Sequence, residues 1–197
     1  MENDQLKKFL LESLEHEKGG VKVYETALKC AIHPELRSEW ERYLEETRNH
    51  EAILTKTCDA FEIDPGEEVP ARKIIRHMGE ALVRAMEMAQ QGGDRAAAQI
   101  VACECVTLAE TKDHLDWELI GKCAEKLKGE EGKALTEAYE EVEEQEDEHL
   151  YHTRGWAREL WIEALGMKAV LPPPEEKKHV KSAIGAARAE QASSRNR

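Results

Sequence analysis

Apolar residues recur every three or four positions along most of the chain, the spacing that places them on one face of an α-helix. Alternating β-branched runs are few, and no proline occurs between Ala71 and Leu171. Because a helix interior tolerates proline least, this stretch favours long helices. Proline and glycine mark the ends of the elements, and Asp94 fits an N-cap. The sequence therefore predicts an all-α protein with helices at about residues 4–31, 34–61, 71–90, 94–128 and 133–165.

The spacing of these helices predicts how they are connected. Short turns join the first two helices and the last two, which makes each pair an antiparallel hairpin. The helix at about 71–90 is long enough to cross between the hairpins, so residues 1–168 are expected to form one four-helix bundle. From Pro172 onward the chain carries six Lys/Arg, three Glu and no aromatic residue. Such a segment can bury too little apolar surface to fold, so residues 169–197 are expected to be a flexible basic tail.

The net charge of the chain argues against two classes of binding partner. The chain has 28 Lys+Arg against 41 Asp+Glu, a formal charge of −13. Nucleic acid and anionic membranes would repel such a surface, so neither is an expected partner. There is no apolar run near the length that spans a bilayer, and the N-terminus lacks a signal-peptide pattern. The five cysteines form no CxxC pair, which favours reduced thiols and a cytoplasmic protein.

Several polar residues fall inside the predicted apolar stripes when each helix is drawn on a wheel. Glu17 lies at the centre of the first stripe, whereas its neighbours Glu15 and Lys18 point away. The stripes of the later long helices contain the following residues: Thr47 and His50 on the second, with Glu51 at its flank; Asp116 at the centre of the third, with Asp113 one turn back; and Glu146 with His149 on the fourth. A buried carboxylate is costly unless it is paired or bound to a metal.

The separation of these residues places them at one level of the bundle. Glu17 and His50 are 33 residues apart, and so are Asp116 and His149. Glu146 and His149 have the i, i+3 spacing that aims a carboxylate and an imidazole at the same cation. Carboxylate and imidazole ligands suit iron or manganese, with zinc ranked behind them. The sequence therefore predicts a metal centre holding one or two ions per chain.

At these residues the chain resembles the ferritin-like superfamily, which includes rubrerythrin and bacterioferritin. Those proteins use Glu on the first and third helices and Glu-x-x-His on the second and fourth. Glu17, followed seven residues later by Tyr24, looks like their first-helix pair, and Glu146 with His149 looks like their fourth-helix motif. Asp116 occupies the position of the third-helix carboxylate. More narrowly, the segments LEETRNHEAIL and KDHLDWELIGKCAEKL are similar to the bacterial YciF-like stress proteins, whose activity is not settled.

Two positions depart from the superfamily pattern. Thr47 stands where the second helix would carry Glu, and Asp116 is shorter than the usual Glu. The loss of the carboxylate at Thr47 removes one ligand, for which Glu51 or water is a substitute. The departures therefore leave an asymmetric or single-metal site open.

The resemblance implies the first of two alternative functions, and the departure at Thr47 favours the second. In the first, Glu17 and His50 hold one metal, Asp116 and His149 hold the other, and Glu146 bridges them. Such a centre reacts with dioxygen or peroxide, as a ferroxidase or peroxidase-like oxidoreductase in oxidative-stress protection. The alternative is a non-enzymatic stress or interaction protein with a degenerate or structural metal site. A homodimer is compatible with either function, whereas the crossover helix and the basic tail argue against a ferritin-type cage.

Overall fold

The computed structural model of the protein describes residues 3–169, so nearly all of the predicted tail lies outside the described residues. The described residues contain no β-strand and form five α-helices. This confirms the prediction of an all-α protein. The helices are α1 (Asn3–Cys30), α2 (Pro34–Ala60), α3 (Pro70–Gln91), α4 (Arg95–Ala124) and α5 (Gly129–Ala164).

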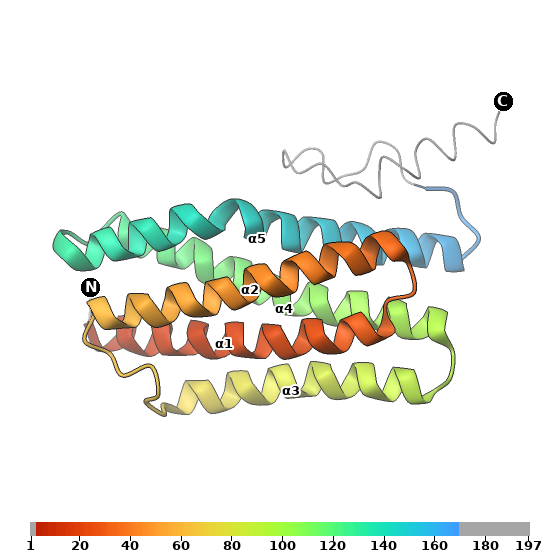
Figure 1. The fold of residues 1–197 in the computed structure, drawn as a ribbon, viewed down its shortest axis with the longest axis horizontal. Coiled ribbons are helices and arrows are strands. Elements are labelled where there is room, and N and C mark those ends of the chain that lie inside the picture. The colour runs from red at the N-terminus through yellow and green to blue at the C-terminus, as the bar shows by residue number, and fades with distance from the viewer. Residues whose placement is uncertain (1–2, 170–197) are drawn as a thin grey trace.

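The four long helices pack side by side as a bundle, and the shorter helix α3 lies outside it. Helix α1 packs against α2 and α4, and α5 packs against the same two helices. Helix α3 covers α1 and α4 and carries the chain back along the length of the bundle (Figure 1). The structure thus contains two antiparallel hairpins and a helical crossover, as the spacing of the breakers predicts.

The apolar core of the bundle is divided into two clusters. One cluster includes Tyr24, Trp40 and Trp156, and the other includes Leu14, Leu54 and Trp117. Along every long helix the chain passes from one cluster to the other near mid-length. The buried polar residues that the sequence singles out occupy this interruption, so the division of the core defines the level of the candidate site.

The turn between α4 and α5 differs from the sequence prediction. Helix α4 ends at Ala124 rather than near Lys128, and α5 begins at Gly129 rather than at Lys133. Gly129, with a φ of 78°, begins the helix, and Gly132 lies within its first turn. A Cβ on Gly132 would approach the Leu127 carbonyl oxygen to 2.6 Å. This glycine therefore permits a close backbone approach and does not break the helix.

Helix α3 is attached to α1 by close packing and by a buried ion pair. Gly19 and Gly79 face each other, so the two backbones approach closely. Glu15 is buried beneath α3, where Arg72 lies 2.8 Å from it and Arg76 2.6 Å. The expectation that Glu15 points away from the protein interior is therefore wrong, because α1 has a second buried face against α3.

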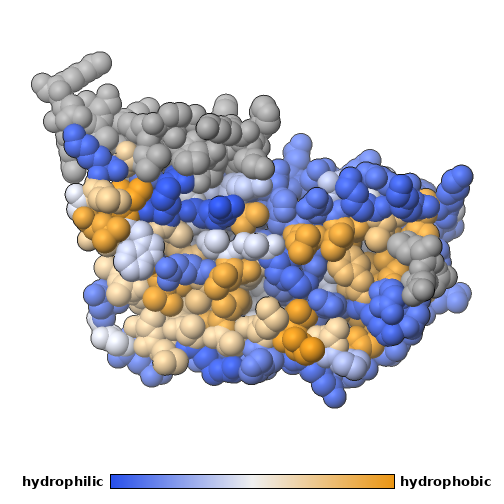
Figure 2. Space-filling view, turned by 180° about the vertical axis from the view of Figure 1, so that it is seen from behind, coloured by the Kyte–Doolittle hydropathy of each residue, from blue (hydrophilic) through white to orange (hydrophobic). Residues whose placement is uncertain are grey.

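Apolar side chains remain exposed on the outer faces of α3 and α4. They include Ile74, Met78, Leu108, Leu115 and Leu119, and orange areas run along the side of the molecule seen in Figure 2. None of the described helices has both the length and the apolar character that a bilayer-crossing segment needs. All five cysteines lie in described helices, and none forms a disulfide.

Candidate metal centre

Six potential ligand residues from four helices fill the gap between the two apolar clusters. Each is at most 3 % exposed. They are Glu17 on α1, His50 on α2, Glu110 and Asp113 on α4, and Glu146 and His149 on α5. Two imidazoles and four carboxyl groups thus share a region that is closed to bulk water.

The ligand atoms form two groups that share Glu146. One group is His50, Glu146 and His149, and the other is Glu17, Asp113 and Glu146; within each, the ligand atoms lie within 4.8 Å of one another. His50 Nδ1 lies 3.1 Å from Glu146 Oε1, and His149 Nδ1 lies 3.6 Å from the same oxygen. Glu110 Oε2 lies 3.6 Å from His149 Nδ1. These separations suit donors that surround a shared cation.

Most of these buried ligand atoms have no hydrogen-bond partner. The unpartnered atoms are Oε2 of Glu17, Nδ1 of His50, Oε2 of Glu110, Oδ1 of Asp113, both carboxylate oxygens of Glu146, and Nδ1 of His149. A buried polar atom without a partner costs roughly 1–3 kcal/mol, and native proteins contain few of them. All six residues contribute at least one such atom, so a cation fits this cluster better than a closed hydrogen-bond network does.

Both histidines are oriented by hydrogen bonds on their outer nitrogen. His50 Nε2 donates to Gln145 Oε1 at 2.8 Å, and His149 Nε2 donates to Glu46 Oε2 at 2.8 Å. These bonds leave Nδ1 of each ring facing the carboxyl groups. A metal-bound histidine typically donates its second ring N–H to a carboxylate or carbonyl group in this way.

Burial and mutual repulsion raise the pKa of three carboxyl groups. The pKa of Glu146 is raised by loss of solvent and then by the charges of Glu110 and Glu17. Burial likewise raises the pKa of Glu17 and of Asp113, and nearby carboxylates add to both shifts. Without a cation these groups therefore favour the protonated form, and a bound metal competes with those protons.

The two histidines respond differently to burial. Loss of solvent, and after it the charge of the neighbouring His149, lowers the pKa of His50 to about 4. Burial also opposes a charge on His149, but Glu110 and Glu46 outweigh it and raise the pKa of that ring. His50 is therefore neutral and able to donate its Nδ1 lone pair, whereas the acidic neighbours of His149 favour a proton on that ring, with which a metal would compete.

Aromatic side chains enclose the centre on two sides. Trp117 Nε1 donates to Glu17 Oε1 at 2.8 Å, and its ring lies 5.8 Å from that of His50. On the other side the Tyr43 ring lies 4.3 Å from the His149 ring. Burial raises the pKa of Tyr24, and the adjacent Glu110 adds to this shift. These rings exclude water and fix the side chains that they contact.

The structure brings together most of the residues that the sequence proposes as ligands. Glu17, His50, Glu146 and His149 all lie in the centre, and Asp113 lies there with them. Glu146 belongs to both groups of ligand atoms, the position expected of a bridging residue.

Three other candidates lie outside both groups. Asp116 is buried, but its carboxylate forms a 2.5 Å ion pair with Lys112. Thr47 is buried and donates its hydroxyl to the Tyr43 carbonyl oxygen at 2.8 Å. Glu51 is half-buried and belongs to neither group. Helix α4 thus contributes Asp113 and Glu110 to the centre, and Asp116 is not among these residues.

The sequence prediction also misses three residues that shape the centre. Glu110 faces His149, while Glu46 and Gln145 orient the two imidazoles. Glu110, Asp113 and Asp116 follow one another at intervals of three, so one row of carboxyl groups runs along α4. That row is the signal by which Glu110 could have been found.

Comparison with known proteins adds no assignment. No protein-family profile, curated protein or solved structure matches the chain.

Proposed function

We propose that the protein binds one or two divalent transition-metal ions in the centre between α1, α2, α4 and α5. The observation that carries this proposal is the convergence of unpartnered, buried ligand atoms from six residues on four helices. Native proteins contain only a few such atoms per hundred residues, and here seven of them lie together on the six residues of the centre. A divalent cation would satisfy them together and would offset the repulsion among the carboxylates.

The donor set favours iron or manganese. Two imidazole nitrogens with several carboxylates suit these ions, and zinc ranks behind them because its sites are usually four-coordinate. None of the five cysteines is among the six ligand residues. The ligands would divide into His50 and His149 with Glu146 on one side, and Glu17 and Asp113 with the same Glu146 on the other.

The finer proposal is a ferritin-like centre. Glu17 on α1, His50 on α2 and the Glu146–His149 pair on α5 support the resemblance drawn from the sequence. At the departure on α2, the Thr47 hydroxyl is engaged by the backbone. Helix α4 contributes two carboxyl groups, Glu110 and Asp113, and so restores the number of acidic ligands.

Iron or manganese held by these residues would supply redox chemistry with dioxygen or peroxide. The chain's own contribution is to hold the donors in place, to keep bulk water out with Trp117 and Tyr43, and to accept protons on the buried carboxyl groups. The corresponding activity is that of a ferroxidase or a peroxidase-like enzyme in protection against oxidants. The engaged hydroxyl of Thr47 favours the second candidate, a structural metal site in a protein that acts through its surface.

Anaerobic titration with Fe(II) and Mn(II) tests the proposal. The wild type is expected to bind one or two ions per chain, whereas Glu146→Ala/His149→Ala loses them. The matched control is His77→Ala/Glu144→Ala, which removes the same residue types from exposed positions and should bind as the wild type does. A wild type that stays metal-free throughout the titration contradicts the proposal. Oxygen uptake or peroxide consumption by the loaded protein then separates the enzyme from the structural metal site.

A further inference from the structure

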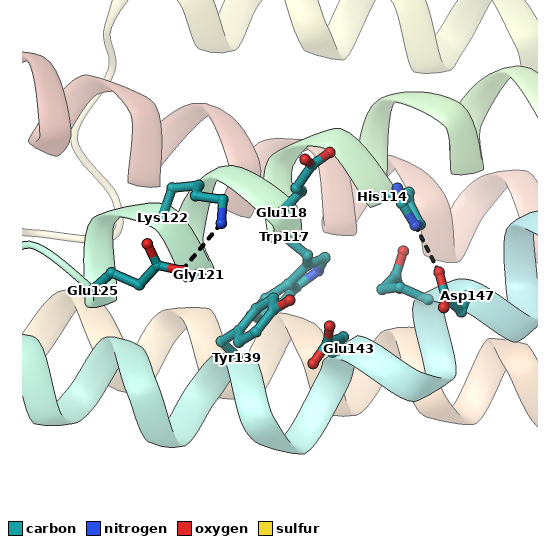
Figure 3. Close-up of a pocket in the computed structure, with 10 residues that line it drawn as sticks. His114, Trp117, Glu118, Gly121, Lys122, Glu125, Tyr139, Glu143 and Asp147 are labelled. Atoms are coloured by element: carbon teal, nitrogen blue, oxygen red, sulfur yellow. Dashed lines mark hydrogen bonds and ion pairs between the residues drawn. The ribbon is translucent and has the colours of Figure 1, made fainter. Parts of the chain in front are cut away.

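A cleft of about 290 Å³ opens between α4 and α5 on the surface of the bundle. Its volume has room for several water molecules. In Figure 3 the side chains of Trp117 and Tyr139, which both line the cleft, overlap in the middle of the view, with Glu143 next to them. The cleft is lined by His114, Trp117, Glu118, Gly121, Lys122, Glu125, Tyr139, Glu143, Glu146 and Asp147.

Two of the lining residues also belong to the candidate metal centre. Glu146 is a member of both groups of ligand atoms, is 1 % exposed, and has no partner for either oxygen. Trp117 donates its indole N–H to Glu17. The inner wall of the cleft is therefore also the outer wall of the centre, and a single carboxyl group faces both.

The remaining charges give the cleft an acidic lining. Lys122 lies 3.1 Å from Glu125 and His114 lies 2.8 Å from Asp147, so each basic group has an acidic partner within the cleft. Glu118 and Glu143 add two further carboxylates. A recess lined by one sign of charge between low-dielectric walls focuses the field and concentrates ions of the opposite sign.

Gly121 keeps this cleft in its shape. A Cβ at this position would lie 2.8 Å from the Tyr139 ring, a distance that forces the ring to move. Because Gly121 has no side chain, the Tyr139 ring can pack against α4 and form part of the wall of the cleft. The opening is built into the packing of α4 against α5.

A second cavity of similar size among the described residues, about 300 Å³, has a mainly apolar lining. It lies between α1, α3 and α4 and is lined mainly by apolar side chains such as Val23, Ile75 and Leu82. Its charged side chain is the cation Lys112. The lining holds one imidazole, His16, and no carboxylate, so it does not attract a divalent cation as the acidic cleft does.

We infer that the α4–α5 cleft is the entrance through which hydrated divalent cations reach the metal centre. Glu118, Glu143 and Asp147 attract the ion and replace part of its water, and Glu146 passes it from the cleft to the buried donors. This inference rests on the proposed function, because it assigns a route to the same site. It separates the rate of metal uptake, set at the cleft, from the affinity, set by the buried ligands.

Stopped-flow uptake of Co²⁺ by the metal-free protein, followed by its visible absorption, tests the inference. The variant is Glu143→Gln/Asp147→Asn, which removes two cleft charges and leaves all six buried ligand residues intact. Its control is Glu80→Gln/Glu87→Gln, which makes the same change of net charge on exposed positions of α3. At low ionic strength the cleft variant is expected to load about tenfold more slowly and to the same final stoichiometry. Added salt should slow the wild type towards the variant.

The possible results test the proposed entrance separately from the proposed metal centre. Equal uptake rates in the cleft variant and the wild type overturn the entrance but leave the metal centre standing. A lower final stoichiometry in the cleft variant also overturns it, because Glu143 or Asp147 would then be a ligand. If the wild type takes up no Co²⁺ at all, the proposed function fails and the entrance fails with it.

Discussion

The orientation of His50 depends on one neutral side chain, Gln145, whose Oε1 accepts the ring Nε2–H. Gln145→Ala removes this acceptor and frees the ring to rotate away from the carboxylates. Loss of such an outer hydrogen bond typically lowers metal affinity about 10–100-fold. Competition for Co²⁺ against a chelating indicator should show a decrease of this size. Gln145→Glu keeps an acceptor at the same place and should retain most of the affinity; equal affinity in Gln145→Ala would mean that other contacts hold the ring.

Glu146 illustrates the conflict between stability and function within a single carboxyl group. Its pKa is raised by burial and by Glu110 and Glu17, so the folded metal-free protein holds a proton that the unfolded chain loses. The contribution of this group to the free energy of unfolding is therefore fully present below its ordinary pKa of 4.5. It decreases as the pH rises from 4.5 towards the raised pKa of the folded protein. Glu146→Gln removes that loss.

We therefore expect Glu146→Gln to be more stable than the wild type at pH 7 when both are free of metal. Thermal melts in the presence of a chelator should give a Tm higher by about 2–4 °C for each kcal/mol recovered. The difference should shrink as pH approaches 4.5. The same change at the exposed Glu144 is the control and should leave the Tm unchanged. A lower Tm for Glu146→Gln at pH 7 would contradict the assignment of strain to this carboxyl group.

The choice between Asp113 and Asp116 shows what a helical wheel can and cannot give. Counting Leu108 and Leu119 as part of the apolar stripe of α4 moves its apparent centre to Asp116. In the structure both leucines are exposed, at 62 % and 42 %, and the buried face is centred on Asp113. Apolar residues on an outer face are common, so periodicity alone does not say which side of a helix faces the core.

At the scale of the elements, a buried ion pair attaches the crossover helix α3 to the bundle. Arg72 donates from Nε to Glu15 Oε2 at 2.9 Å and from Nη1 to the carbonyl oxygens of Pro65 and Glu67. Arg72→Met leaves Glu15 with Arg76 alone and frees the loop carbonyls. Breaking a buried pair in this way costs about 3–5 kcal/mol, which urea denaturation measures.

Two variants check this interpretation of the α1–α3 contact. Glu15→Leu/Arg72→Met removes both charges and should recover much of the lost free energy of unfolding, because no unpaired charge is left buried. Arg84→Met removes an exposed arginine of the same helix and should cost less than about 0.5 kcal/mol. Equal losses in Arg72→Met and Arg84→Met would show that the buried pair contributes little.

The number, order and approximate ends of the helices follow from the sequence because local signals set them. Proline at the first turn of α2 and α3 and Asp94 before α4 act within one helical turn. The start of α5 could not be predicted in this way. Gly132 indicates a turn in the sequence, but in the structure it lies inside the helix and makes room for the Leu127 carbonyl oxygen. The burial of Glu15 does not follow either, since it depends on α3 packing against a second face of α1.

For the whole molecule, the centre connects both hairpins, since its ligands come from α1, α2, α4 and α5. Metal binding should therefore stabilise the bundle as a unit, by about 2.7 kcal/mol when free metal is hundredfold above its Kd. Hydrogen exchange measures this: with Co²⁺, slowly exchanging amides near mid-length of the four helices should exchange about a hundredfold more slowly.

Helix α3 contributes no ligand, so amides that open with α3 alone should keep their exchange rates. Glu146→Ala/His149→Ala, treated with the same Co²⁺ concentration, should show no change. Protection gained in one hairpin only would mean that the metal does not join the two halves.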